Sequence, residues 1–436
     1  MKFENVALLL PNCTVGFGSL ETEGSRISKI ELVRTVPTDS SHSPSSFFPH
    51  PSSFFPLPSS FFPLPSSFRH LLLPGLVNCH GHTAMTLVRG VGGGLPLQRW
   101  LEEAIFPIEA KMTADDIRAG VRWGALEMLA GGTTQVIDMY DFPDAGEAAF
   151  ESVGLKASVS RVGLSFVPGR LEECIAFTRA HPRAHVCIHS EYLTDEPFCR
   201  ALADVNNREL KRPVHVHVSE TEKEHRDCLA RHGRTPVAYL AATGLLDCGG
   251  FAAHGVWCTD DDFRILKEKN VVLVHNPSSN MKLGSGFARI PRALELGVKV
   301  ALGTDGCASN DNLDLFEEMH LASLIHKGLA KDPTVLSPWD VIEMATYGNR
   351  LAVGAPADFC VVDMNRLHLR PTLDLPNLVV HSMHASDVVQ TVVDGRLLYD
   401  HGKFPTVDVE RMRADFDAAV GRLLPGADSA PAEFLV

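Results

Sequence analysis

The chain of 436 residues has no long apolar run. A helix that crosses a bilayer needs about 20 consecutive apolar residues, and no segment of this sequence approaches that length. The first residues also lack the basic and then apolar pattern of a secretory signal peptide. We therefore expect a cytoplasmic protein without a membrane partner.

Paired cysteines are missing too. The sequence has 10 cysteines but no Cys-x-x-Cys pair, and several of them, such as Cys187 and Cys360, lie singly in apolar runs. A disulfide framework or a cysteine-bound zinc site would show clustered spacing. The pattern favours free, buried thiols in a reducing compartment.

The chain has few positive charges for its size. Its 40 basic residues are outnumbered by 53 acidic ones, which gives a formal net charge of −13. Binding to a phosphate backbone depends on Lys and Arg, so a nucleic-acid partner is not expected. A small-molecule substrate fits this charge better.

The common nucleotide-binding motifs are absent as well. Leu95 stands where a dinucleotide fingerprint would continue after Gly90-Val-Gly-Gly-Gly94, and no Gly-Lys-Ser/Thr phosphate loop occurs. His189-Ser-Glu191 matches the His-x-Glu of deaminases with cysteine zinc ligands, but the Pro-Cys-x-x-Cys of that class is missing. A deaminase with this sequence would need a different fold.

A repeated phrase occupies residues 44–68. It reads Pro-Ser-Ser-Phe-Phe-Pro three times and then Pro-Ser-Ser-Phe. Two prolines in each repeat exclude a continuous helix. We expect a low-complexity insertion in a surface loop, with a phenylalanine-rich docking segment for a partner as the alternative.

Between residues 74 and 350, short apolar runs alternate with helical spacing, which predicts eight strand-then-helix units. A (β/α)₈ barrel is typically ~250 residues long, so this segment has a suitable size. The predicted strands are 74–82, 134–138, 155–162, 184–189, 213–218, 250–254, 271–274 and 298–302. The predicted helices include 115–129, 171–180, 221–232, 260–269 and 290–296.

Strand patterning occurs at both ends of the chain. Asp394-Gly395 between apolar runs predicts a hairpin. The expected strands are 6–10 and 27–33, with breaks at Gly16, Gly18 and Gly24, and then 359–362, 379–380, 391–393 and 396–399. We predict one β-sandwich domain from residues 1–73 and 351–405, the barrel from 74–350, and a C-terminal helix (409–424) and tail within 406–436.

The clearest chemical signal is His80-Gly-His82, at the end of the first barrel strand. Residues i and i+2 of a strand point to the same side, so both imidazoles can face one metal ion. Taken alone, the motif is equally compatible with a solvated turn. The ends of later strands decide between these interpretations.

Polar residues follow later strands at equivalent positions. His217 lies near the end of the fifth strand, His254 ends the sixth, and Asp305 follows the eighth. Each could instead be a hydrogen-bonded core residue or an ordinary turn residue. Because the strand ends meet at one face of a barrel, we predict a single metal site of His80, His82, His217 and Asp305.

Three imidazoles and one carboxylate suit zinc, with one position open to water. Zinc lowers the pKa of bound water towards neutrality, which makes hydroxide available for hydrolysis. Iron or manganese is the alternative ion. The fourth strand ends in Ile188-His-Ser190 without a lysine that could be carbamylated to bridge a second ion, so we expect one Zn²⁺ per subunit.

Five segments resemble the 5-methylthioadenosine/S-adenosylhomocysteine deaminases of the amidohydrolase superfamily. They are Pro74-Gly-Leu-Val-Asn-Cys-His-Gly-His82, His217-Val-Ser-Glu-Thr221, His254-Gly255, His275-Asn-Pro-Ser-Ser-Asn-Met-Lys-Leu283 and Gly303-Thr-Asp-Gly-Cys-Ala-Ser-Asn310. The resemblance implies hydrolytic removal of a purine 6-amino group. Glu220 would protonate the ring nitrogen next to the attacked carbon, while His254 and Asp305 would handle the protons of the zinc-bound water.

The resemblance also implies substrate contacts. Glu109 would accept hydrogen bonds from ribose hydroxyls, and His189 would contact the substrate. Arg161 and Arg170 would hold the carboxylate of S-adenosylhomocysteine, for which the bidentate guanidinium geometry is suited. A homo-oligomer is expected by analogy with similar families.

Other functions stay open. They are deamination of another aminopurine (guanine, 8-oxoguanine) or of an aminofutalosine-like nucleoside, triazine hydrolysis, and ligand binding without turnover. Two features depart from the family: the repeats before the metal motif, and the short segment between Thr346 and Asp358. The second would weaken the junction between barrel and sandwich.

Overall fold

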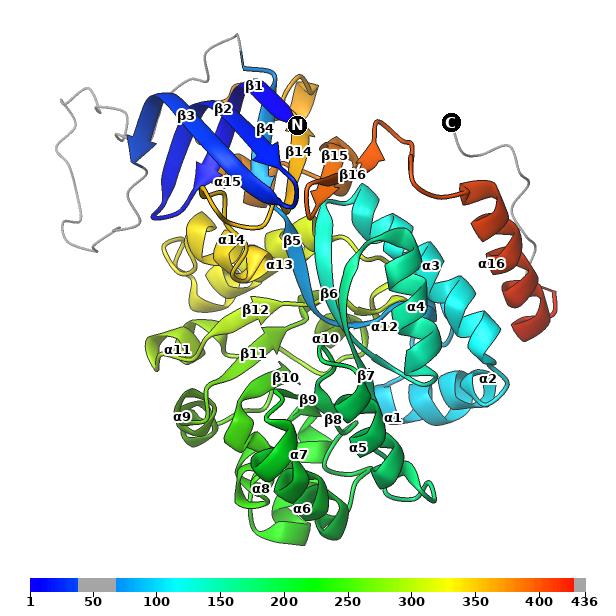
Figure 1. Cartoon of the computed structure of the whole chain (residues 1–436). Helices are drawn as coiled ribbons and strands as arrows, with labels where there is room; N and C mark the ends of the chain where they lie inside the picture. The colour runs from blue at the N-terminus through cyan, green and yellow to red at the C-terminus, as the bar shows by residue number, and fades with distance from the viewer. Residues whose placement is uncertain (38–67, 427–436) are drawn as a thin grey trace, which may run out of the picture.

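The computed structural model describes residues 1–37 and 68–426 (Figure 1). Residues 44–67 of the repeats, the docking alternative and the end of the predicted tail lie outside the described residues. Phe68, the last residue of the repeats, is buried, and its ring packs edge-on against Phe17 with 5.1 Å between ring centroids.

Both chain ends contribute to one mixed sheet, as predicted. Figure 1 shows it above the barrel, with the N-terminal strands beside the C-terminal ones. The strand order is β16-β15-β14-β4-β1-β2-β3. The bounds are Lys2–Leu10 (β1), Thr14–Glu23 (β2), Arg26–Pro37 (β3), His70–Pro74 (β4), Phe359–Asp363 (β14), Val388–Val393 (β15) and Arg396–Asp400 (β16).

This sheet is continuous and curls over its own core, rather than forming two separate sheets. The Ala357 amide donates to the Ser25 carbonyl at 2.8 Å, and the Gly395 amide donates to the Ala357 carbonyl at 3.0 Å, so the β2–β3 turn lies against the β15–β16 turn. Leu8, Leu72, Phe359 and other buried side chains fill the space between the two halves. The core is therefore sandwich-like although the hydrogen bonding is that of a single sheet.

The predicted breaks at Gly16 and Gly18 are wrong, because both residues lie inside β2. A Cβ atom on Gly18 would lie 1.8 Å from the Glu31 carbonyl oxygen of β3. The pairing also shifts register between Phe17 and Gly18. Glycine here permits the close approach of two strands at a bulge, a role that the sequence pattern does not distinguish from a turn.

All eight predicted barrel strands are present and parallel to their neighbours. They are Leu76–His82 (β5), Thr133–Tyr140 (β6), Lys156–Arg161 (β7), Val186–Cys187 (β8), Val214–Val218 (β9), Gly250–His254 (β10), Val271–His275 (β11) and Val300–Leu302 (β12). They form two sheets, β12-β11-β10-β9-β8 and β13-β5-β6-β7. The short strand β13 (Asp305–Gly306) follows β12 and pairs with β5, which places Asp305 opposite Gly81.

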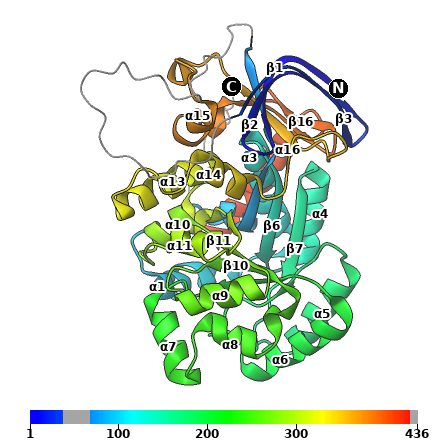
Figure 2. The ribbon, with the colours of Figure 1, turned by 90° about the vertical axis from the view of Figure 1, so that its left-hand side faces the viewer.

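Helices surround these strands (Figures 1 and 2). The five predicted barrel helices are confirmed as Ala114–Ala130 (α3), Arg170–Ala180 (α5), Glu222–His232 (α7), Asp260–Glu268 (α9) and Ile290–Glu295 (α11). The other α-helices between residues 74 and 350 are Leu97–Arg99 (α1), Phe106–Glu109 (α2), Pro143–Val153 (α4), Glu196–Val205 (α6), Pro236–Ala242 (α8), Pro277–Lys282 (α10), Cys307–Asn310 (α12), Leu315–Ala330 (α13) and Pro338–Thr346 (α14). Local capping sets several helix starts: the Thr113 hydroxyl accepts from the Asp116 amide before α3, and Thr259 does the same with Asp262 before α9.

The predicted strand at Val379-Val380 is wrong, because both residues lie in helix α15 (Leu375–His381). The Asp374 side chain caps this helix by accepting from the Asn377 amide at 3.1 Å, and Pro376 occupies its first turn. A cap and an initial proline favour a helix strongly enough to outweigh the strand propensity of two valines. The predicted C-terminal helix is confirmed as α16 (Val409–Leu423), which packs on α3 through stacked Phe416 and Trp123 rings.

Hydrogen bonds join the barrel to the sheet of both chain ends at the short segment between Thr346 and Asp358. The Asn349 side chain donates to the Gly75 carbonyl at 2.8 Å. The Gly354 amide donates to the Ile27 carbonyl at 2.8 Å, and the Ile27 amide donates to the Ala355 carbonyl at 3.0 Å. Lys156 of β7 pairs with Asp358 and Asp394 at 2.6 Å. We keep the division into residues 1–73 with 351–405, 74–350 and 406–436 as a proposal, and a weakened junction stays a prediction.

Candidate active site

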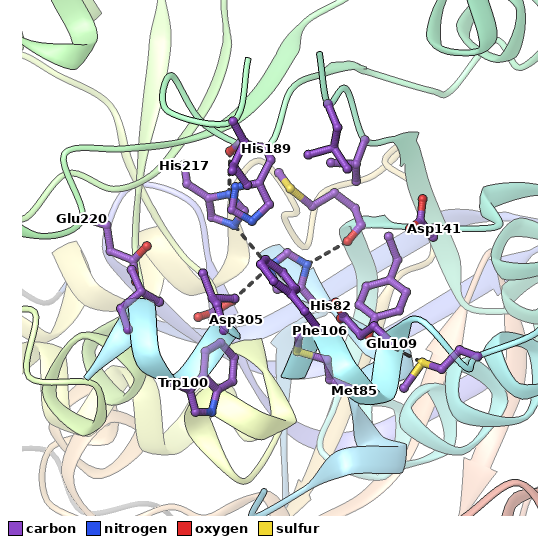
Figure 3. Close-up of a pocket in the computed structure, with 18 of the residues that line it drawn as sticks. His82, Met85, Trp100, Phe106, Glu109, Asp141, His189, His217, Glu220 and Asp305 are labelled. Atoms are coloured by element: carbon purple, nitrogen blue, oxygen red, sulfur yellow. Dashed lines mark hydrogen bonds and ion pairs between the residues drawn. The ribbon is translucent and has the colours of Figure 1, made fainter. Parts of the chain in front are cut away.

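The strand ends bring five predicted polar residues together. His80 and His82 come from β5, His217 from β9, His254 from the end of β10, and Asp305 from β13. The Asp305 Oδ1 atom lies 3.3 Å from His80 Nε2 and 3.2 Å from His82 Nε2. The Nε2 atoms of His82 and His217 are 3.2 Å apart. Figure 3 shows His82, His217 and Asp305 pointing towards one another.

The backbone is strained at two of these positions. His254 has a φ of 73° and Asp305 a φ of 61°, in the left-handed region that residues with side chains rarely adopt. Such strain persists only where the surroundings hold it, and it is concentrated at functional sites. Asp305 is held by the hydroxyls of Ser279 and Ser309, which donate to its Oδ2 atom at 2.6 and 2.7 Å.

Hydrogen bonds behind the histidines fix their tautomers. The Nδ1 atom of His82 lies 2.7 Å from the Met139 carbonyl oxygen, and that of His217 lies 2.7 Å from the His189 carbonyl oxygen. A carbonyl can only accept, so both Nδ1 atoms carry hydrogen. In the neutral rings, the Nε2 lone pairs therefore point into the site, as metal-bound histidines require.

These donor atoms need a cation between them. When both rings are neutral, the facing Nε2 atoms of His82 and His217 are both acceptors, so a proton or a metal ion must lie between them. The buried Nε2 atom of His80 has no hydrogen-bond partner among the described residues. Burial lowers the pKa of His80 to about 4, which keeps its ring neutral. For His82, burial lowers the pKa and Asp305 raises it, with a net rise to about 9, so without a metal ion the ring carries a second proton on Nε2 beside this carboxylate. A bound metal ion would take the place of that proton.

The donor set fits a metal ion. Ligand atoms of His80, His217, His254 and Asp305 all lie within 4.8 Å of one another. His82 adds a further nitrogen at 3.2 Å from Asp305 Oδ1. Imidazole nitrogens with one carboxylate oxygen are zinc ligands. The residues present therefore fit zinc, and the predicted set with His82 in place of His254 stays a prediction.

A family model described as the amidohydrolase family matches residues 71–398. The chain belongs to the amidohydrolase family. It is 36% identical over 375 residues to a 5-methylthioadenosine/S-adenosylhomocysteine deaminase from Acetivibrio thermocellus, which covers 81% of this chain and 87% of that protein. It is 40% identical over 380 residues to a 5′-deoxyadenosine deaminase from Methanosarcina mazei, with 82% and 88% covered.

Solved structures agree with this assignment. The amidohydrolase superposes on an adenosine deaminase from Xanthomonas campestris with bound zinc, with a TM-score of 0.83, 26% identity, and 97% and 98% of the two chains covered. It also shares its fold with an atrazine chlorohydrolase from Arthrobacter aurescens, with a TM-score of 0.80, 19% identity, and 96% and 99% covered. The predicted architecture, a barrel with a further domain built from both chain ends, is that of this family.

A cavity of about 420 Å³ opens beside the histidines. His82, His189, His217, His254 and Asp305 line one part of it. Apolar side chains, among them Trp100, Leu101, Met139 and Leu283, line much of the rest. A space of this size with a few polar groups is typical of a small-molecule site.

Glu220 also lines the cavity, and it is buried. Burial raises the pKa of its carboxyl, so the protonated form persists to higher pH than for an exposed glutamate. Its backbone amide donates to Glu224 Oε2 at 2.7 Å, and the Ser219 amide donates to Glu224 Oε1 at 2.8 Å. Glu224, which the sequence analysis missed, therefore holds the turn that carries Glu220. Its position four residues later was the available signal.

Glu109 and His189 both reach the cavity, as predicted. The Tyr140 hydroxyl donates to Glu109 Oε1 at 2.5 Å and fixes that carboxylate at the cavity wall. Burial lowers the pKa of His189 to about 3, so its ring is neutral. Tyr140 was missed because it lies two residues beyond the predicted end of its strand.

The Glu109 carboxylate gives a test of nucleoside binding. Glu109→Gln should lower kcat/KM for a ribonucleoside by about 10-fold to 100-fold, because hydrogen bonds to charged groups contribute roughly 1.5–3 kcal/mol. Steady-state kinetics with 2′,3′-dideoxyadenosine, which has no ribose hydroxyls to donate, should show no such difference. Glu102→Gln, at an exposed glutamate in the preceding helical segment Trp100–Ile105, is the matched control. An equal loss on both nucleosides would contradict the predicted role.

Arg161 and Arg170 do not line the cavity. Arg161 pairs with Asp141 at 3.2 Å and with Glu173 at 2.5 Å. Arg170 pairs with Asp141 at 2.9 Å and with Glu173 at 3.2 Å. Their contact with a substrate carboxylate stays a prediction.

Proposed function

We propose that this amidohydrolase is a zinc-dependent deaminase of adenosine-type nucleosides. It would convert the 6-amino group of S-adenosylhomocysteine, 5-methylthioadenosine or adenosine to the inosine form and release ammonia. The observation that carries the proposal is the cavity that Glu220 shares with the His and Asp donor set. The names of the similar proteins from Acetivibrio and Methanosarcina support the choice of substrates.

The proposed metal ligands are His80, His82, His217 and Asp305, with one zinc per subunit. When bound, zinc makes hydroxide available at neutral pH by lowering the pKa of water. Iron or manganese could occupy the same donors, because imidazole and carboxylate accept several divalent ions. The bound zinc of the Xanthomonas structure favours zinc.

The chain's own residues then manage the protons. The Glu220 carboxyl donates a proton to the purine ring nitrogen next to C6, which makes that carbon a better electrophile. His254 and Asp305 accept the protons of the attacking water and return one to the departing ammonia. Asn280 orients His254 for this task, because its Oδ1 atom lies 2.8 Å from His254 Nδ1. The other ring nitrogen, His254 Nε2, lies 3.9 Å from the Glu220 carboxylate. Glu109 accepts the ribose hydroxyls, and His189 contacts the base.

The reaction can be followed directly. Zinc-loaded protein should release ammonia and reduce adenine absorbance with 5-methylthioadenosine, S-adenosylhomocysteine or adenosine. Absence of turnover on all three, with zinc bound and the fold intact, would reject the proposal. Guanine, 8-oxoguanine, aminofutalosine-like nucleosides and triazines would then be tested in turn. A ligand that binds without turnover would indicate a non-catalytic protein.

The structure bears on only one of the predictions about partners and location, the absence of a membrane-spanning helix. Among the described residues, every helix is too short or too polar to cross a membrane. The cytoplasmic location, the absence of a nucleic-acid partner and the homo-oligomeric state stay predictions. Light scattering on the purified protein would measure the oligomeric state.

A further inference from the structure

Two short helices carry the serines that hold Asp305. Ser279 lies in α10 and Ser309 in α12, and their hydroxyls donate to the same oxygen, Asp305 Oδ2, at 2.6 and 2.7 Å. Because two donors occupy this oxygen, the other one, Oδ1, is left to face His80 and His82 at 3.3 and 3.2 Å. The orientation of the Asp305 carboxylate therefore depends on where the two serines lie.

Neither helix is long enough to hold its own position. α12 has four residues and α10 has six, and helices of this length gain little stability from their own hydrogen bonds. Asp305, two residues before α12, adopts a φ of 61°, which is also unfavourable by itself. Neighbouring contacts must maintain such a conformation, and α10 packs against both α12 and α13.

One buried side chain joins the two short helices. Glu318, in α13, is fully buried and does not line the cavity. Its Oε1 atom accepts a hydrogen bond from Asn310 Nδ2 at 2.7 Å, and its Oε2 atom accepts one from the Ser278 amide at 3.2 Å. Asn310 directly follows Ser309, and Ser278 directly precedes Ser279. We call Glu318, Asn310 and Ser278 the carboxyl clamp.

The carboxyl clamp also reaches the backbone next to Asp305. Asn310 Nδ2 donates a second hydrogen bond, to the Thr304 carbonyl, at 2.8 Å. A side-chain amide nitrogen has two hydrogens, so Glu318 and Thr304 together use both. Glu318 thereby orients the amide that holds the residue before Asp305, where the backbone is strained.

The two contacts of Glu318 call for a carboxyl group. Both oxygens of a carboxyl can accept hydrogen bonds, whereas the side-chain nitrogen of glutamine can only donate and would face a donor here. Burial raises the pKa of Glu318 to about 8, and no cation pairs with its carboxyl among the described residues. Glu318 therefore acts here as a double acceptor, and this role does not require it to carry a charge.

We propose that Glu318 is a positioning residue: through the carboxyl clamp it holds the two serines and, with them, the orientation of Asp305. The inference rests on the proposed deaminase function, in which Asp305 binds zinc and accepts a proton from water. Glu318 forms its hydrogen bonds outside the cavity, so it acts through other residues. Loss of the clamp lets the Asp305 carboxylate turn, which weakens both of its tasks.

The first test is Glu318→Gln. At saturating zinc, kcat for 5-methylthioadenosine should fall by about 10-fold to 100-fold, and zinc affinity, measured by competition with a chelator, should fall by a similar factor. KM should stay unchanged, because the proposed nucleoside contacts Glu109 and His189 lie on other elements. Glu317→Gln, at the exposed neighbour on α13, is the matched control and should change neither quantity. Unchanged kcat and zinc affinity, or a change confined to KM, would overturn the proposal.

A double-mutant comparison tests the route. Ser279→Ala combined with Ser309→Ala removes both donors to Asp305 Oδ2. Adding Glu318→Gln to this variant should lower kcat by less than about twofold, since residues that act through the same contacts do not have additive effects. A further loss of about tenfold would show that Glu318 acts by another route and would overturn the proposal. Zinc affinity gives the same comparison if the serine variant has no measurable turnover.

The test depends neither on the folding of Glu318→Gln nor on turnover. Asn310→Ala removes the other half of the clamp and should reproduce the fall in kcat and in zinc affinity, and thermal denaturation identifies a variant that has lost its fold. An unchanged kcat and zinc affinity in folded Asn310→Ala would overturn the proposal. Absence of turnover in the unmodified protein would reject the deaminase function, and the zinc affinities would then still decide whether the clamp holds Asp305.

Discussion

Replacement of Glu220 by glutamine is expected to lower kcat/KM for the deaminated nucleosides by about 10²-fold to 10⁴-fold, the usual contribution of a general acid. Glutamine keeps the shape of the side chain and its place in the cavity but has no carboxyl proton to donate. Burial raises the pKa of Glu220, so the native carboxyl holds that proton nearer to neutral pH. The measurement is the rate of ammonia release under substrate-limiting conditions.

The same change should leave the metal and the fold in place. The structure puts the Glu220 carboxylate 3.9 Å from His254 Nε2, and Glu220 is not among the proposed metal ligands. Metal content and melting temperature should therefore match those of the unmodified protein. Glu222→Gln, two residues later at the exposed start of α7, is the matched control and should retain turnover. Retention of most activity in Glu220→Gln would show that another group protonates the purine.

The pH dependence of kcat/KM separates the role of Glu220 from that of the groups that accept protons from water. The pKa of Glu220 is raised, so the protonated acid is lost as pH rises through its folded-state value, and kcat/KM should fall on the alkaline side. Glu220→Gln should remove this alkaline limb from the profile. The remaining pH dependence would then report the groups that accept protons from water.

The barrel strands and the residues of the candidate site were predictable because their signals are local. A buried parallel strand reads as a short apolar run, and all eight such runs became strands. Barrel strands end at one face, so a polar residue after each run is a candidate for the same site. His80, His82, His217, His254 and Asp305 were found in this way, without knowledge of which helix packs where.

The two errors have different causes. Gly18 resembles a turn residue because its close approach to the Glu31 carbonyl is a contact between two strands, which the sequence pattern does not show. Val379 resembles a strand residue because valine favours strands, although the Asp374 cap that starts the helix lies only five residues earlier. For Arg161 and Arg170, the contact with a substrate carboxylate stays a prediction. Their guanidinium groups indicate anion binding, but only the fold reveals that Asp141 and Glu173 already provide the anions.

Removal of the metal is expected to abolish turnover, and loss of one ligand should do nearly the same. His217→Ala removes the Nε2 atom that faces His82 at 3.2 Å, so zinc would lose one of its nitrogen donors. Loss of a residue that only hydrogen-bonds to a metal ligand typically lowers metal affinity by about 10-fold to 100-fold. Loss of a ligand itself should cost more, so we expect the zinc affinity to fall by more than about 100-fold. Zinc content after dialysis against a chelator of known affinity measures this change independently of activity.

Variants of two further histidines serve as comparisons for the zinc affinity of His217→Ala. His215 does not reach the cavity, but its Nε2 atom lies 2.9 Å from His80 Nδ1, so His215→Ala should cost about 10-fold to 100-fold in zinc affinity. His232, at the end of α7 on the outside of the barrel, should be replaceable by alanine without any change in zinc content. Treatment of the unmodified protein with a chelator should stop ammonia release, and added zinc should restore it. Stoichiometric zinc in His217→Ala after the same dialysis would exclude His217 as a ligand and favour a donor set built on His80, His82, His254 and Asp305 instead.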